Sequence, residues 1–399
     1  MRNKVWLVFA CIIPGLITGC HDDTGMPGAE TVSYKVAVIM PLSSGNDWNR
    51  TIDWALDNFR QAQVGLPKIT EIQVELKNEE DADLAEYLSR VASDDTYTAI
   101  IGPYSSRNAR LAAIACVAEQ KTLILPLATS TEFQRIFAGK ECIWNLAQSD
   151  LTQCEILLMQ MAVSDMPSVS LLTADDDYGK SFSDWFAYQA IELGLEVEDM
   201  VIYRNNEELK NGVAHFADKR FRSGALLFAP SKASDFQLFD ETYDQLDRGS
   251  FPMVYCSDVA HSKTLVGKIK HTYEGVSPSA DPASGFVNAY RSKFGESPVA
   301  GEAHLFDAIS LLGYALAAFG DADLNGAIKN IVDGRDNWNR GWMASDMQAA
   351  LLRLQAGGFP NLSGVSGDWT FDQKHYASVL NSSYCHWVLK NGEYHTLEY

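Results

Sequence analysis

A regular change of hydrophobic period along the chain constrains its fold more than any other feature. Val36 to Met40 is a continuous apolar run that stops at Pro41, as expected for a strand buried on both faces of a parallel sheet. From residue 51 the apolar positions follow a helical spacing, which predicts an amphipathic helix. Up to residue 146 the pattern predicts further strands at 72–76, 99–101, 122–127 and 142–146, with helices at 84–91 and 107–119. The alternation predicts an α/β fold with a parallel sheet covered by helices on both faces.

The same pattern starts again after residue 150, which predicts a second α/β unit. Its predicted strands are 168–173, 196–203, 225–229 and 253–256, and its predicted helices are 150–164, 179–193, 208–222 and 233–246. After a Ser/Pro-rich loop at 276–285 come predicted helices at 286–294, 301–319, 324–332 and 345–355, then strands at 368–371 and 384–390. A chain of this length is expected to form two lobes.

The first twenty residues have the form of a bacterial lipoprotein signal. A short basic start precedes an apolar stretch at 5–17, and Ile17-Thr18-Gly19-Cys20 resembles a lipobox after which Cys20 would be acylated. The apolar stretch contains Pro14 and is too short to span a bilayer comfortably. We therefore expect a cleaved signal over 1–20, a flexible tether over 21–33, and a folded part held in the cell envelope by lipid, facing the periplasm or the cell surface.

Charge and cysteine content exclude several classes of protein. The net charge of -20 repels phosphate backbones, which argues against a nucleic-acid partner and against binding to an anionic membrane surface. Cys116 and Cys142 flank one predicted strand and could form a disulfide in an oxidising compartment, or remain buried as free thiols. No CxxC spacing occurs, and Asp175 to Asp177 lack the EF-hand pattern, so we expect no metal site and no cofactor.

The loops that follow the predicted strands contain the candidate ligand-binding residues. In open parallel sheets the residues just past the strand ends line the ligand crevice. These loops are rich in hydroxyls, aromatic rings and carboxylates, an inventory that suits a small polar or zwitterionic solute. They are PLSSGNDW at 41–48, GPYSSR at 102–107, PLATS at 126–130, ADDDYG at 174–179, APS at 229–231 and SDVAH at 257–261.

At this point the chain resembles the type I periplasmic solute-binding proteins, in particular the leucine/isoleucine/valine-binding proteins and the receptor family ligand-binding region. The segments that carry the resemblance are VAVIMPLS, AIIGPYSS, ILPLATS with IWNLAQSD, VSLLTADDDYGKS, VNAYRSKFGESPVAGEAHLFDAISLL and GVSGDWTFD. The resemblance implies two Rossmann-like lobes with parallel sheets, joined by three crossings of the chain and closing on a ligand by a hinge. It implies a first lobe of 34–147 plus 261–361 and a second lobe of 148–260 plus 362–399.

The resemblance also implies roles for individual residues. The loop of Tyr104, Ser105 and Ser106 and the loop of Ala128 and Thr129 would hold a ligand carboxylate through hydroxyls and backbone amides. On the second lobe, Tyr178 would cover the ligand and Asp258 would pair with a ligand ammonium. The chain departs from the family in having the large aromatic residues Trp48 and Trp144 at or beside the expected site, where Trp48 could stack on the ligand.

Each of these residues also has a structural interpretation. Trp48 could pack at a helix start, and Tyr178 could be a surface tyrosine. Ser105 and Ser106 could cap the following helix, and Asp258 could cap the next one. Tryptophan stacking would equally suit sugars or heterocycles, so an amino acid is one of several ligand classes that remain open. A further histidine, at position 304, lies within an apolar helical face and is expected to be a packed core residue.

These features together predict a lipid-anchored solute-binding protein that captures a small polar ligand such as an amino acid, for an ABC-type permease. The alternative is a sensor or interaction lipoprotein of the same fold. An enzyme is disfavoured because none of the patterns GxSxG, HExxH, GxxxxGK[ST] and GxGxxG occurs in the chain.

Overall fold

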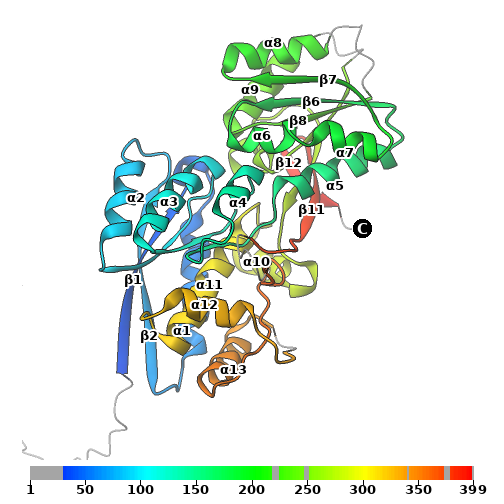
Figure 1. Ribbon diagram of the computed structural model, residues 1–399. Helices are drawn as coiled ribbons and strands as arrows, with labels where there is room; N and C mark the ends of the chain where they lie inside the picture. The colour runs from blue at the N-terminus through cyan, green and yellow to red at the C-terminus, as the bar shows by residue number, and fades with distance from the viewer. Residues whose placement is uncertain (1–29, 218–223, 247–250, 339–340, 373–377, 398–399) are drawn as a thin grey trace, which may run out of the picture.

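Two separate β-sheets organise the chain (Figure 1). The computed structural model describes residues 30–217, 224–246, 251–338, 341–372 and 378–397. Cys20, the signal sequence and residues 21–29 of the expected tether lie outside these ranges. Residues 30–33 of that tether belong instead to the first strand, where they pair with the second. The α/β fold with parallel-sheet lobes that the sequence predicts is confirmed.

The sheet of the first lobe has the strand order β2-β1-β3-β4-β5 and is parallel throughout. Its central strands are nearly continuous apolar runs because both faces are covered. The strands are β1 Glu30–Met40, β2 Lys68–Asn78, β3 Tyr97–Ile101, β4 Thr122–Leu125 and β5 Ile143–Asn145.

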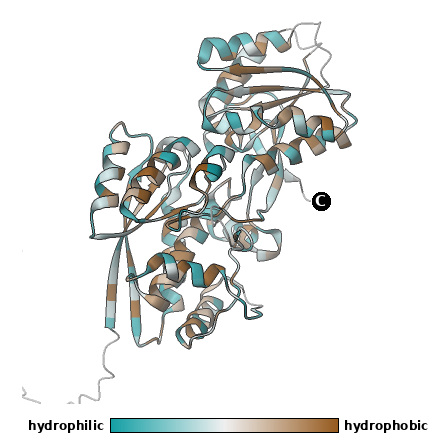
Figure 2. Cartoon of the chain, viewed as in Figure 1, coloured by the Kyte–Doolittle hydropathy of each residue, from teal (hydrophilic) through white to brown (hydrophobic). Residues whose placement is uncertain are grey.

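Successive residues of β1 point to opposite faces of this sheet and enter two different cores. Val36, Val38 and Met40 pack with α1 and α11, whereas Ala37 and Ile39 pack with α2 and α3. In Figure 2 these helices carry both hydrophobic and hydrophilic residues, as expected for helices with one buried face. The helices of this lobe are α1 Trp48–Ala62, α2 Leu84–Ser93, α3 Ser106–Glu119, α4 Thr131–Phe137, α10 Phe286–Phe294, α11 Glu302–Phe319, α12 Leu324–Val332 and α13 Ala344–Gln355.

The sheet of the second lobe has the order β12-β11-β10-β9-β8-β6-β7, and its last two strands in the chain are antiparallel. Helices α5, α6 and α7 cover one face, and α8 and α9 cover the other. The strands are β6 Ser168–Ala174, β7 Glu196–Tyr203, β8 Ala225–Ala229, β9 Met253–Cys256, β10 Tyr273–Pro278, β11 Tyr384–Lys390 and β12 Glu393–Leu397. The helices are α5 Asp150–Val163, α6 Asp177–Ser183, α7 Phe186–Glu192, α8 Asn206–Phe216 and α9 Ala233–Tyr243.

The chain passes between the two sheets three times, but two passages lie later than the sequence indicated. Residues 273–278, expected in the first lobe, form β10 of the second sheet and pair with β9 and β11. In the tail, Leu362, Trp369 and Phe371 pack in the core of the first lobe, where a strand at 368–371 was expected in the second. Only isolated bridges form there, so the last passage falls shortly before β11.

Several side chains whose role the sequence did not decide are core residues. Cys116 and Cys142 are both buried free thiols. Trp144, expected at or beside the ligand site, is instead 1% exposed and donates from Nε1 to Asn325 Oδ1 at 3.0 Å. His304 is fully buried in α11. This helix is long and apolar enough to cross a membrane, but 83% of it is buried inside the protein, so it serves as the core helix of the first lobe.

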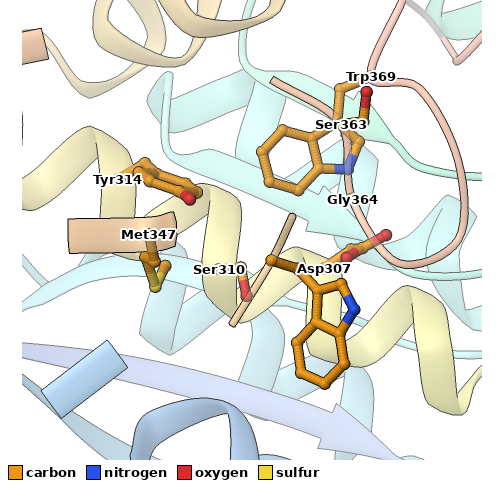
Figure 3. Close-up of a pocket in the computed structure, with 8 residues that line it drawn as sticks. Asp307, Ser310, Tyr314, Met347, Ser363, Gly364 and Trp369 are labelled. Carbon is orange, nitrogen blue, oxygen red and sulfur yellow. The ribbon is translucent and has the colours of Figure 1, made fainter. Parts of the chain in front are cut away.

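The GVSGDWTFD segment packs against α11 beside a small cavity (Figure 3). Its volume of about 10 Å³ is room for one water at most. The Asp307 carboxylate beside it accepts hydrogen bonds from Val365 N at 2.7 Å, Ser366 N at 2.8 Å and Ser366 Oγ at 2.5 Å. Gly364 leaves the space that this carboxylate fills, because a Cβ there would lie 2.1 Å from Asp307 Oδ2. This site therefore fixes a loop and is too small for a solute.

Candidate functional site

A cleft of about 710 Å³ is lined by the loops at the carboxyl ends of strands from both sheets. This is where open parallel sheets place their ligands. The first lobe contributes residues within 41–48, 79–80, 104–107 and 127–129, and the second within 174–178, 203–206, 231–237 and 258–268. Seven of the eight predicted ligand-contact residues line it: Trp48, Tyr104, Ser105, Ser106, Thr129, Tyr178 and Asp258.

Ala128 is the exception, because it does not line the cleft. It is fully buried, and its backbone amide donates to Asn145 Oδ1 at 3.3 Å. The Asn145 side chain in turn donates to the Ala128 carbonyl at 2.6 Å. The backbone groups of Ala128 are thus engaged inside the first lobe, and the neighbouring Thr129 is the residue of this loop that meets the cleft.

Glu79, which the sequence analysis did not single out, organises the first-lobe wall. Its Oε2 accepts hydrogen bonds from the backbone amides of Tyr104 at 2.8 Å and Ser105 at 3.1 Å. Burial raises the pKa of Glu79 to about 7, although these hydrogen bonds act in the opposite direction. Ser105 is the N-cap residue of α3, but its side chain makes no capping hydrogen bond, so its hydroxyl is not used for that purpose. Glu79 directly follows β2, but the strand expected at 72–76 ended too early to place Glu79 at its end.

Trp48 and Tyr104 form an aromatic floor. Their ring centroids lie 5.5 Å apart, and Trp48 Nε1 donates to the Pro41 carbonyl at 3.1 Å, which fixes the indole. Trp48 is only 1% exposed, so the packing role is shown, although the residue also belongs to the lining of the cleft. Behind Tyr104 lies Gly301, with φ +87°, where a Cβ would come within 2.5 Å of the Tyr104 ring. The ring position therefore depends on a glycine at the start of α11.

Tyr178 and Asp258 meet on the second-lobe wall. The Tyr178 hydroxyl donates to Asp258 Oδ1 and lies 3.2 Å from Gln153 Oε1. Tyr178 is buried, which removes the surface-tyrosine interpretation. Asp258 begins the short helix η3, Asp258–Ala260, and the backbone amides of Asp258 and Val259 lie close enough to stabilise its carboxylate, as the capping interpretation expects. Burial raises the pKa of Asp258, and the hydrogen bond from Tyr178 opposes that rise. A buried carboxylate held this way can pair with a cation that enters the cleft.

Contacts between the lobes border the cleft. Ser130 Oγ donates to the Asp177 carbonyl at 3.0 Å, and Thr131 N donates to Ser181 Oγ at 3.0 Å. Both contacts join the start of α4 in the first lobe to α6 in the second.

A charged cluster forms a further contact between the lobes. Lys263, in the segment that follows β9, lies 3.1 Å from both Glu296 and the fully buried Glu302. Arg50 lies 3.5 Å from Glu302 and also pairs with Glu296. Tyr290 donates to Glu302 at 2.6 Å. The charge on Glu302 is therefore balanced by one cation from each lobe.

Residues 47–378 match the family described as receptor family ligand binding region. No curated protein matches the chain. Similar solved structures include the leucine-binding protein LivK of Thermotoga maritima, at 17% identity, with 92% of this chain and 98% of that one covered and a TM-score of 0.64.

Two further structures illustrate the range of ligands. LivJ of Streptococcus pneumoniae, a branched-chain amino acid transporter substrate-binding protein in complex with isoleucine, has 15% identity, coverage of 92% and 99%, and a TM-score of 0.65. A solute-binding protein of an ABC transporter from Rhodopseudomonas palustris, in complex with 3,4-dihydroxybenzoic acid, has 18% identity, coverage of 92% and 96%, and a TM-score of 0.66. At these identities the likeness shows a shared fold.

Proposed function

Because this chain belongs to the receptor family ligand binding region, we propose that it is an extracytoplasmic solute-binding protein that captures a small polar ligand of the amino-acid type. The observation that carries the proposal is the cleft itself. It is bounded by hydroxyl groups from the ends of β3 and β4 on one side and by Tyr178 and Asp258 on the other. A ligand with a carboxylate and an ammonium group would bridge the two walls.

Each wall has a proposed task. Ser105, Ser106 and Thr129 receive the carboxylate, because hydroxyls and amides at a helix start are good donors to an anion. Asp258 receives the ammonium, and Tyr178 keeps the Asp258 carboxylate in place. The binding free energy is largest when both walls contact the ligand. Binding therefore shifts the protein toward a closed arrangement of its lobes.

We further propose that Cys20 is acylated and that the protein hands its ligand to an ABC-type permease in the membrane. The ABC transporter proteins among the similar structures support this, and so does the lipobox-like sequence at 17–20. We assign a binding role and no catalytic one, since binding accounts for the side chains that meet in the cleft.

A thermal-shift screen of the purified protein tests the proposal. The panel contains amino acids, short peptides, sugars, nucleosides and small carboxylates. A ligand at one hundred times its dissociation constant stabilises the fold by about 2.7 kcal/mol, which raises Tm by a few degrees. A hit among amino acids supports the proposal. A hit among sugars or nucleosides alone overturns the amino-acid assignment, and no shift with any compound moves the role toward sensing through a protein partner.

A further inference from the structure

The part of the second-lobe wall that is formed by the segments after β6, β7 and β8 is unsuited to an aliphatic or aromatic ligand side chain. These segments line the cleft with carboxylates, hydroxyls, amides, two basic side chains and two alanines, and their largest carbon surfaces are Tyr178 and Tyr203, whereas the apolar Val259 and Leu265 belong to the separate segment after β9. Sites for apolar ligands are lined mostly by apolar side chains. The ligand part that extends along this wall must therefore be polar or charged.

This wall holds a second carboxylate position, built around Asp235. Asp235 lies in the first turn of α9, is 5% exposed, and accepts a hydrogen bond from the Tyr203 hydroxyl at 2.9 Å. Burial raises the pKa of Asp235, and the negative charge of the nearby Asp176 adds to that rise. Asp176 itself accepts hydrogen bonds from Gly179 N at 2.9 Å and from the Ser231 hydroxyl. Both carboxylates line the cleft.

The first carboxylate position, at Asp258, has an uncompensated neighbour. Asp150 is 1% exposed, and no hydrogen bond of normal geometry reaches either of its carboxylate oxygens from the described residues. Burial, followed by the charges of Asp258 and Asp176, raises its pKa well above the usual range, while Thr129 and Ser181 lie close enough to act in the opposite direction. Asp150 thus lies buried behind Asp258, and no cation of the described chain is paired to either residue.

The basic groups of the wall lie toward solvent. Arg204 pairs with Asp175 at 2.9 Å and has a side chain that is 70% exposed. Lys232 lies 3.9 Å from Asp235 Oδ1 and is 67% exposed, so it is a weak and displaceable partner. Arg107 and Lys268 are also exposed cleft residues. The buried charges of the cleft are carboxylates, and they favour a cation that brings its own charge into the interior.

We propose that the ligand is a basic amino acid, with its α-ammonium group at Asp258 and a distal ammonium or guanidinium group at Asp235 and Asp176. The proposal rests on the proposed function and deepens it by assigning the chemical class of the ligand side chain. The distal cation displaces Lys232 from Asp235 and gains two carboxylates that are held in place by Tyr203 and Ser231. A neutral side chain of the same shape would leave these carboxylates unpaired.

Isothermal titration calorimetry with two matched pairs of compounds tests this assignment. L-arginine is compared with its neutral isostere L-citrulline, and L-lysine with L-norleucine. We expect the cationic member of at least one pair to bind the unmodified protein on the order of tenfold or more tightly than its neutral partner. In Asp235→Asn this ratio should fall toward one, whereas in Asp184→Asn, an exposed acid of the same lobe outside the cleft, it should not change.

A second variant tests the same assignment if Asp235→Asn does not fold. Lys232→Met removes the competing cation and should tighten arginine or lysine binding by a few-fold. Tighter binding of citrulline or norleucine than of the basic partner overturns the inference and leaves the solute-binding function intact. Absence of binding for all four compounds also overturns it, and the wider thermal-shift panel then decides whether the amino-acid function survives.

Discussion

The Tyr178 hydroxyl donates a hydrogen bond to Asp258 Oδ1, although the two residues are 80 positions apart in the chain. The bond joins the first turn of α6 to the segment that follows β9, so two neighbouring loops at the sheet edge present one polar group each to the cleft. The pair lowers the stability of the protein without ligand, because a buried carboxylate is destabilising until a cation reaches it. The same carboxylate favours binding of a cationic group.

Asp258→Asn separates these two effects. The amide removes the desolvation penalty of the charge, so Tm without ligand should stay the same or rise, while affinity for amino acids that bind the unmodified protein should fall about tenfold or more. Calorimetry and thermal denaturation measure the two quantities, with Asp184→Asn as the control. Unchanged affinity would show that Asp258 does not pair with the ligand.

The triple variant Ser105→Ala, Ser106→Ala and Thr129→Val tests the first-lobe wall. Removing three hydroxyl donors should weaken binding of a carboxylate ligand by about tenfold or more, because hydrogen bonds to a charged acceptor contribute about 1.5–3 kcal/mol each. Ser89→Ala, on the exposed face of α2, is the matched control. If the triple variant binds as well as the unmodified protein, the carboxylate lies elsewhere.

His304 should make stability depend on pH. It is fully buried, neither ring nitrogen has a hydrogen-bond partner among the described residues, and burial lowers its pKa to about 4 from the usual 6.5. A histidine with a lowered folded pKa contributes stability above pH 6.5 that is lost as the pH falls toward 4.

Urea unfolding at pH 7.5 and pH 5 measures this contribution. We expect His304 to account for a loss of about 2 kcal/mol between these values, and His304→Leu should lack that part of the loss. Replacement of the exposed His395 in the same way is the control. An equal pH dependence in His304→Leu and the unmodified protein would contradict the assignment.

Lys263→Met should weaken the contact between the lobes. Lys263 is one of two cations beside the fully buried Glu302, and Arg50 alone would balance it from 3.5 Å. Loss of one partner from a buried cluster should destabilise the fold by about 2 kcal/mol, less than for a charge left with no partner. Urea denaturation gives the value, with the exposed Lys68→Met as reference. A change below about 0.5 kcal/mol would assign the cluster no role in stability.

Cys20→Ala should abolish lipid attachment. Metabolic labelling with an alkyne fatty acid is expected to mark the unmodified protein and not the variant, and the variant should leave the membrane fraction. Cys116→Ala should keep the label, because that thiol is buried in the fold. Label retained in Cys20→Ala would place the anchor at another residue.

The parts of the fold that follow from the sequence are those with a strong period. The runs at 196–203, 225–229 and 253–256 became strands with those bounds. The residues of 225–229 are buried in a covered sheet, whereas 196–203 forms the edge strand and is mostly half-buried. β10 was missed because its sequence, YEGVSP, ends in a Ser/Pro-rich stretch, and only pairing with β9 and β11 makes it a strand. The short helix α4 lacks enough turns for a period, and β12 depends on its partner β11.

The candidate site divides in the same way. Residues directly after strands, such as Ser106, Tyr178 and Asp258, could be placed at the cleft because strand ends converge there. Asp150 and Asp235 could not be foreseen, since each lies in the first turn of a helix and its importance depends on burial against other loops. Ala128 follows a strand too, but Asn145 takes its backbone groups, which only tertiary structure reveals.

The absence of a side chain at Gly301 has a consequence for how the ligand specificity of such a protein could change. Tyr104 lines the cleft, yet the space that its ring occupies is left open by a residue at the start of α11 that does not line the cleft. An alanine there would have to displace the ring and, with it, the Trp48 indole that packs on it. Ligand specificity could therefore evolve through a mutation behind the binding surface, without a change in any residue that lines the cleft.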